Sequence, residues 1–220
     1  MINILLIIGE VIICYLALLI LYKKYKTDGI YVFGIIAAML SCILNLKRIS
    51  IMNVPIPLGF GLTTSIIIGA NLIIQKRGKE EIKNYLILTT ISILASVIVL
   101  NLSAMTESSK YGILANESYN SIFLQNLRIY IALILSVVLS IWLDSELYSL
   151  VKKIKNKIII SNIFTIIIVN FFENALFVVI AYLFDYKVID LFLCFILRYM
   201  IKTIIGLIGT IPLYIANKND

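Results

Sequence analysis

Histidine is absent from the sequence, and charged side chains are scarce. Only 14% of the 220 residues are charged, whereas 61% are hydrophobic, and the mean hydropathy is +1.04. A soluble domain carries about 25% charged residues, because it needs polar side chains to cover its surface. The composition therefore excludes a soluble domain and predicts an integral membrane protein.

The same absences limit the chemistry of the chain. Without histidine no histidine-based metal site can form. The three cysteines, Cys14, Cys42 and Cys194, lie in apolar segments without a partner at zinc-site spacing, and we interpret them as buried apolar thiols. The sequence also lacks a Gly-rich phosphate loop and an Asp pair at catalytic spacing. We therefore expect no enzyme activity, no metal and no cofactor.

Long hydrophobic runs, in contrast, are abundant. A helix needs about 20 mainly apolar residues to cross a bilayer, and it must be a helix because lipid offers the backbone no hydrogen bonds. Seven segments qualify, at roughly 2–22, 29–46, 59–75, 82–104, 127–151, 159–184 and 188–216. The sequence thus predicts an all-α polytopic bundle of about seven transmembrane helices in the lipid bilayer.

Basic residues between these spans predict the orientation. In a soluble protein the net charge of +7 would suggest nucleic acid, but here the charges sit in short loops, so we expect no nucleic-acid partner. One side carries Lys23, Lys24, Lys26, Lys76, Arg77, Lys79, Lys83, Lys152, Lys153, Lys155, Lys157 and Lys218. The other side carries Lys47, Arg48, Lys110 and Lys187, with Arg128 at its margin. The richer side faces the cytoplasm, which places the N-terminus outside and the C-terminus in the cytoplasm.

Two connections differ from short polar loops. Residues 49–64 contain two prolines and two glycines, which forbid a continuous helix. This segment is either a re-entrant piece tucked into the bundle or a hairpin over its outer surface. Residues 103–126 are polar with interspersed aromatic residues, and we expect an outer loop with an interfacial turn.

Polar residues inside the spans are the candidate functional residues. A charge at the centre of a membrane helix costs about 2.5–3.5 kcal/mol on insertion scales, so such residues face the bundle interior and have a partner. Asn170, Glu173 and Asn174 share one helix face, and so do Arg198 and Lys202. We expect these faces to meet, with Glu173 contacting Lys202. The contact is either interhelical packing alone or part of a polar cavity that binds a hydrogen-bonding solute.

Further polar residues extend this set. Asp144 lies near the inner end of its span, where it would line the inner mouth of such a cavity. Asn71 and Gln75 form a one-sided amide pair. Arg128 opens a span on the outer side and either binds solute or reaches the lipid headgroups. Glu10 has no evident partner.

The order and spacing of these residues carry a resemblance to a known family. Residues 70–81, ANLIIQKRGKEE, keep the family frame around Gly78, with Asn71 and Gln75 at the positions of a family Asp and Glu. The family's Arg, Ser and Asp correspond to Arg128, Ser140 and Asp144, and its later polar motif to Asn162, Asn170, Glu173 and Asn174. The last span matches with Lys202, Pro212 and Tyr214. In these features the chain resembles the queuosine precursor transporter family, also called the vitamin uptake transporter family, over about residues 28–216.

The resemblance implies an importer of a 7-deazaguanine precursor of queuosine. It implies a six-helix transporter core, residues 27–220, preceded by an additional N-terminal helix, residues 1–26. The substrate-binding residues would be Asn71, Gln75, Arg128, Asp144, Asn170, Glu173, Asn174 and Lys202. The chain departs from the family where Asn71 and Gln75 replace carboxylates and Glu173 replaces an Asp, so the solute could be another nucleobase-like compound.

The residues alone support the same class of function. A purine-like ring needs hydrogen-bond donors and acceptors along its edge, and the amides and Glu173 supply them. The leading hypothesis is an importer of a small nucleobase-like solute. The alternative is the substrate-binding subunit of an energy-coupling-factor vitamin transporter, which would need a separate ATPase module as a partner. A homodimer is left open.

Overall fold

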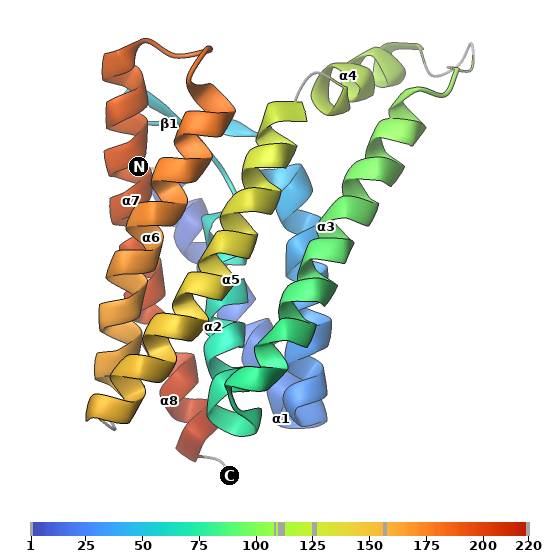
Figure 1. Cartoon of the computed structure of the whole chain (residues 1–220). Helices are drawn as coiled ribbons and strands as arrows, with labels where there is room; N and C mark the ends of the chain where they lie inside the picture. Colours follow the sequence, from blue (N-terminus) through green and yellow to red (C-terminus); the bar gives the residue numbers. More distant parts are fainter. Residues whose placement is uncertain (1, 108, 110–112, 125–126, 156–157, 219–220) are drawn as a thin grey trace.

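The computed structural model describes residues 2–107, 109, 113–124, 127–155 and 158–218. It is an almost entirely helical bundle with a small β-hairpin at one end (Figure 1). The elements are α1 (Ile2–Leu44), β1 (Arg48–Ile51), β2 (Val54–Pro57), α2 (Phe60–Arg77), the 3-10 helix η1 (Lys79–Glu81), α3 (Ile82–Ala104), α4 (Ile113–Phe123), α5 (Leu127–Lys155), α6 (Ile158–Tyr182), α7 (Val188–Ile208) and α8 (Thr210–Lys218).

The first helix, α1, is a hairpin of two antiparallel helical segments. The backbone of Lys26 (φ 53°, ψ −137°) is non-helical and divides α1 in two. Gly29 lies against the backbone of Leu21, which a continuous helix would place about 12 Å away. Figure 1 shows the first segment running from the N-terminus to the bottom of the bundle and the second returning upward beside it. The expectation of two spans, 2–22 and 29–46, is therefore confirmed.

Helix α2 lies at the centre of the bundle. Every residue from Phe60 to Ile74 is buried. Five stretches in the described part of the chain are long and apolar enough to cross a membrane by composition, and α2 is not one of them. Because protein rather than lipid surrounds it, α2 can carry Thr63, Thr64 and Asn71 inside the bundle. With the two segments of α1, α2, α3, α5, α6 and α7, the bundle has the expected seven membrane helices.

Residues 48–57 form a β-hairpin at the end of the bundle that holds the N-terminus (Figure 1). Met52 and Asn53 form its turn with positive φ, as a two-residue type I′ turn requires. Leu58 donates a backbone hydrogen bond to Lys47, so the pairs that contain Pro55 and Pro57 fall at positions where no ladder hydrogen bond is needed. The segment forms a hairpin, but its second strand is largely buried against α7 instead of lying over the outer surface, and residues 60–64 belong to α2.

Two further segments differ from the sequence-based expectation. The connection expected as a loop contains α4, in which Tyr119 packs on Phe123 with ring centroids 4.4 Å apart and meets the Ser103 hydroxyl at 2.6 Å. The last span, expected as one helix, is divided into α7 and α8 at Gly209. Pro212 lies in the first turn of α8, where its missing N–H interrupts the helical hydrogen bonds least.

Most of the basic residues lie at one of the two ends of the bundle. The Lys26 turn, the α2–η1 junction and the end of α8 lie together at the lower end of Figure 1, and the N-terminus, the β-hairpin and α4 lie at the upper end. The lysines and arginines that the sequence assigns to the more basic side of the membrane therefore lie at one end of the bundle, which we call the basic end. Lys110 and Lys157 lie outside the described residues.

We predict that Gly29→Val destabilises the α1 hairpin. A Cβ at this position would collide with the backbone carbonyl of Leu21, and overpacking of this kind costs about 1–3 kcal/mol. The melting temperature of the purified protein in detergent, followed by scanning fluorimetry, should fall by several degrees.

Gly9→Val is the matched control, because nothing lies within 4 Å of a Cβ at Gly9 on the same helix. Equal melting temperatures of the two variants would contradict the antiparallel packing of the two segments.

Candidate functional site

An ion pair with a third charged partner lies in the middle of the bundle. Glu173 of α6 accepts a hydrogen bond from Lys202 Nζ at 2.7 Å and another from Arg198 Nη2 at 3.2 Å. Lys202 and Arg198 are one turn apart on α7, so both reach the same carboxylate. All three side chains are at most 3% exposed. We call these residues the ionic cluster, and the expected contact between Glu173 and Lys202 is present in it.

Two asparagines lie on the same face of α6 as Glu173. Asn170 and Asn174 are fully buried, and Asn174 donates to the backbone oxygen of Asn170 at 2.6 Å. Among the described residues, Asn174 Oδ1 and both polar atoms of the Asn170 amide have no hydrogen-bond partner. The same holds for Nε and Nη1 of Arg198. Unused donors and acceptors therefore surround the ionic cluster.

A second group of polar side chains connects α2, α5, α6 and α8. Asn71 donates to Asn162 Oδ1 at 3.1 Å, and Asn162 donates to Thr210 Oγ1 at 2.7 Å. Asp144 of α5 lies beside Asn71 and Thr165, yet neither of its carboxyl oxygens has a hydrogen bond to another described residue. We call Asn71, Asp144, Asn162, Thr165 and Thr210 the polar layer.

Gln75 and Arg128 lie outside both groups. Gln75 donates to the Tyr148 hydroxyl at 2.5 Å, one helical turn from Asn71 toward the basic end. Arg128 is exposed at the opposite end of the bundle, where it lies 3.7 Å from Asp185 and 5.0 Å from the centroid of the Phe184 ring. The structure thus joins Asn170, Glu173, Asn174 and Lys202, and separately Asn71 and Asp144, but does not bring Arg128 to them.

An aromatic column connects the ionic cluster to the end with the β-hairpin. The Arg198 guanidinium lies 3.6 Å from the centroid of the Phe177 ring, and Phe177 contacts Tyr182 edge-to-face. Tyr182 stacks on Tyr186 with centroids 4.8 Å apart. Arg48 of the hairpin lies over both tyrosines and pairs with Asp185 at 3.1 Å. This column closes the cluster from that end.

Several contributing residues were not selected from the sequence. Arg198 shares a helix face with Lys202 but is not one of the predicted substrate-binding residues. On α5, Ser136 and Tyr148 extend the predicted positions Ser140 and Asp144 into one polar stripe with a spacing of four residues, a signal that a periodicity search would detect. The contact of Thr210 with Asn162 has no such signal, because it joins residues 48 positions apart.

Loss of the Glu173 carboxylate would leave Lys202 and Arg198 without the partner that they share in the ionic cluster. We predict that Glu173→Gln lowers the stability of the solute-free protein by about 3–5 kcal/mol, because it leaves two buried cations without a counter-charge. Thermal unfolding in detergent should show a lower melting temperature, partly restored in the double variant Glu173→Gln/Lys202→Met.

Glu146→Gln is the control for this comparison. The Glu146 carboxylate pairs with Lys79 at 2.5 Å, but both side chains are about 40% exposed, and such pairs contribute about 0–1 kcal/mol. If Glu173→Gln melted no lower than Glu146→Gln, the buried ion pair would be refuted.

The chain matches a family model described as "Putative vitamin uptake transporter" over residues 57–216, which contain the ionic cluster and the polar layer. Comparison with curated proteins and with solved structures gives no significant match. The family match covers well over half of the chain and includes α6 and α7, the two helices that carry the ionic cluster. The chain is therefore a multi-pass membrane protein that belongs to the vitamin uptake transporter family.

Proposed function

We propose that the protein imports a small, planar, nucleobase-like solute, with a 7-deazaguanine precursor of queuosine as the first candidate. The solute would bind at the ionic cluster, between α6 and α7, with the polar layer beneath it. Family membership supports uptake of a small molecule. The chemistry of the cluster supports the narrower choice of solute.

The observation that carries this proposal is the set of buried polar atoms without partners. A buried donor or acceptor that lacks a hydrogen bond costs about 1–3 kcal/mol. Among the described residues, the Asn170 amide, Asn174 Oδ1, and Nε and Nη1 of Arg198 are all in this state beside Glu173. Interhelical packing alone would not require so many unsatisfied groups in one place. A solute with alternating donors and acceptors would satisfy them.

The arrangement suits the edge of a heterocycle. The Asn170 amide offers both a donor and an acceptor, Asn174 offers an acceptor, and Arg198 offers donors in one plane. Two cations and one carboxylate face each other in the ionic cluster, so a neutral solute or one with an acidic N–H is favoured over a cation. Phe177 lies beside Arg198 and supplies an aromatic face.

Transport requires the helices to move relative to one another. Glu173, Lys202, Asn170 and Asn174 are all at most 2% exposed, so a solute cannot reach them from either side in this conformation. We infer alternating access, in which the aromatic column around Arg48 separates to admit solute. The Arg48–Asp185 pair is partly exposed, so breaking it costs little.

The decisive variant is Asn170→Leu, which replaces the amide with an apolar side chain of similar size. The amide has no side-chain partner in the described protein, so its removal should leave the solute-free melting temperature equal or higher. Affinity for the solute should fall at least ten-fold, because the solute then loses its hydrogen bonds. A thermal-shift screen with nucleobases and 7-deazaguanines identifies the solute, and uptake into proteoliposomes that contain the chain alone measures transport.

Asn101→Leu is the matched control, since Asn101 is also an intramembrane amide but bonds to Val97 O in its own helix, α3. Wild-type uptake by Asn170→Leu would overturn the proposed site. Solute binding without uptake by the chain alone would favour the ATPase-dependent alternative.

We also propose that the basic end faces the cytoplasm. Two positions at opposite ends of the bundle allow a direct test, because Met52 at the hairpin tip is 83% exposed and Lys218 ends α8 at the basic end. The described cysteines, Cys14, Cys42 and Cys194, are buried, so they should react slowly. A membrane-impermeant maleimide added to intact cells should label Met52→Cys and not Lys218→Cys; the opposite pattern would reverse the orientation.

A further inference from the structure

The polar layer contains a buried carboxylate without a counter-charge. Asp144 of α5 is fully buried, and neither of its oxygens has a hydrogen bond to another described residue. The buried cations Lys202 and Arg198 contact Glu173 instead. An ionised carboxylate that lacks both a charge partner and hydrogen bonds is costly to bury. No described residue balances this charge, so Asp144 needs a proton or a bound cation.

The orientation of the neighbouring Asn71 amide follows from a chain of hydrogen bonds. The backbone oxygen of Gly206 can only accept, so the side-chain nitrogen of Asn162 must face it, at 3.4 Å. The Asn162 oxygen then faces Asn71 and accepts from its nitrogen at 3.1 Å. The remaining polar atom of Asn71, Oδ1, is buried and has no hydrogen bond to another described residue. A second unsatisfied acceptor therefore lies on a residue beside Asp144.

The hydroxyl group of Thr165 is the third oxygen group beside Asp144. Thr165 donates its single hydroxyl hydrogen to the backbone oxygen of Ser161, at 2.9 Å, one turn earlier on α6. The lone pairs of the Thr165 oxygen thus remain available to a ligand. Three helices, α2, α5 and α6, bring amide, carboxylate and hydroxyl oxygens together in the polar layer.

A bound metal ion satisfies these oxygens better than a proton or a water molecule does. A protonated carboxyl group donates one hydrogen bond, which leaves at least one of the buried acceptors unsatisfied. A water molecule can donate to two oxygens but does not balance the charge. A hard cation contacts several oxygens at once. Because Asp144 is the only acidic residue of the polar layer, and the described residues contain no group of three acidic, histidine or cysteine side chains, a single positive charge is enough.

We propose that the polar layer binds a sodium ion, with Asp144, Asn71 and Thr165 as its protein ligands. The expectation of no metal rested on the absence of histidine and of paired cysteines, and a sodium ion needs only oxygen ligands. Thr165 and Glu173 are eight residues apart on α6, about 12 Å along the helix, so the ion and the solute have separate sites. Coupling of the ion to uptake rests on the proposed function, whereas binding of the ion does not.

The test uses the purified full chain in detergent, with sodium chloride, potassium chloride and choline chloride compared at equal ionic strength. We expect sodium chloride to raise the melting temperature by several degrees at saturation, because a ligand that binds only the folded protein stabilises it. Potassium and choline should not do so. Binding of a radioactive sodium isotope should saturate over the same range of concentration.

Two variants remove ligands of the ion. Asp144→Asn should weaken sodium binding about ten-fold or more, because it removes the negative charge of the site. Its melting temperature without sodium should equal or exceed that of the wild type, since the unbalanced buried charge is gone. Loss of the ion is thereby separated from loss of the fold. Thr165→Val, which removes one neutral ligand, should weaken binding several-fold.

Thr89→Val is the matched control, because Thr89 is also a buried threonine that donates to a backbone oxygen of its own helix, α3, at 2.8 Å. This variant should bind sodium as the wild type does. The proposal is overturned if Thr89→Val weakens binding as much as Thr165→Val does, or if Asp144→Asn binds sodium normally. It is also overturned if potassium or choline gives an equal shift, or if sodium gives none. A rise in melting temperature on acidification would in that last case assign the balancing charge to a proton.

The ion site and the proposed function fail in different experiments. A sodium shift in a chain that takes up no nucleobase-like solute would refute the function and leave the ion site intact. Uptake that proceeds equally in sodium and in choline, together with the absence of a sodium shift, would refute the ion site alone.

Discussion

The buried contact of Glu173 with Lys202 and Arg198 sets the geometry on which the site depends. Away from water, a carboxylate and an ammonium are stable only when they are paired and hydrogen-bonded. Both distances to Glu173 are short, so a rotation or translation of α7 against α6 would leave charges unpaired in a low-dielectric interior. The register of these two helices is therefore fixed, and with it the positions of Asn170 and Asn174.

Two further helices are placed by weaker polar contacts. The polar stripe of α5 faces α6, and Asn71 of α2 reaches Asn162. This second group is neutral apart from Asp144, so it restrains the helices less than the ionic cluster does. Such a difference suits a transporter, because helices that must separate during transport need contacts that can break at low cost.

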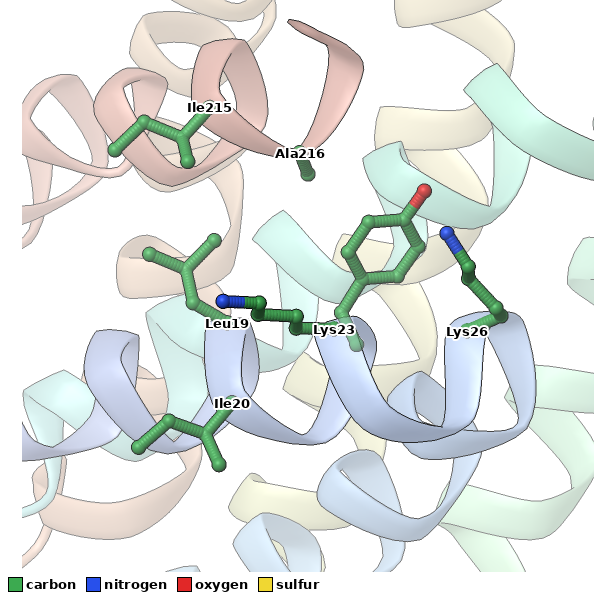
Figure 2. Close-up of a pocket in the computed structure, with 7 residues that line it drawn as sticks. Leu19, Ile20, Lys23, Lys26, Ile215 and Ala216 are labelled. Carbon is green, nitrogen blue, oxygen red and sulfur yellow. The ribbon is translucent and has the colours of Figure 1, made fainter. Parts of the chain in front are cut away.

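The two ends of the bundle are built differently. The end with the β-hairpin is closed by stacked aromatic rings beneath Arg48. At the basic end, α8 and the α1 hairpin leave a cavity whose lining includes Lys23 and Lys26 (Figure 2). The family match begins at residue 57, so the α1 hairpin, which forms one wall of this cavity, lies before it. The division into an additional helix, 1–26, and a core, 27–220, stays a prediction.

The sequence by itself determined the membrane class, the seven helices and the pairing faces of α6 and α7. These follow from local quantities, namely hydrophobic length and residues three or four positions apart. Only the tertiary structure decided that α2 is enclosed by protein, that Arg128 lies away from the ionic cluster, and that Arg198 joins Glu173. It also decided the β-hairpin and the contact between Asn162 and Thr210. These depend on which helices become neighbours, and a hydrophobic helix surface shows the same pattern whether lipid or another helix covers it.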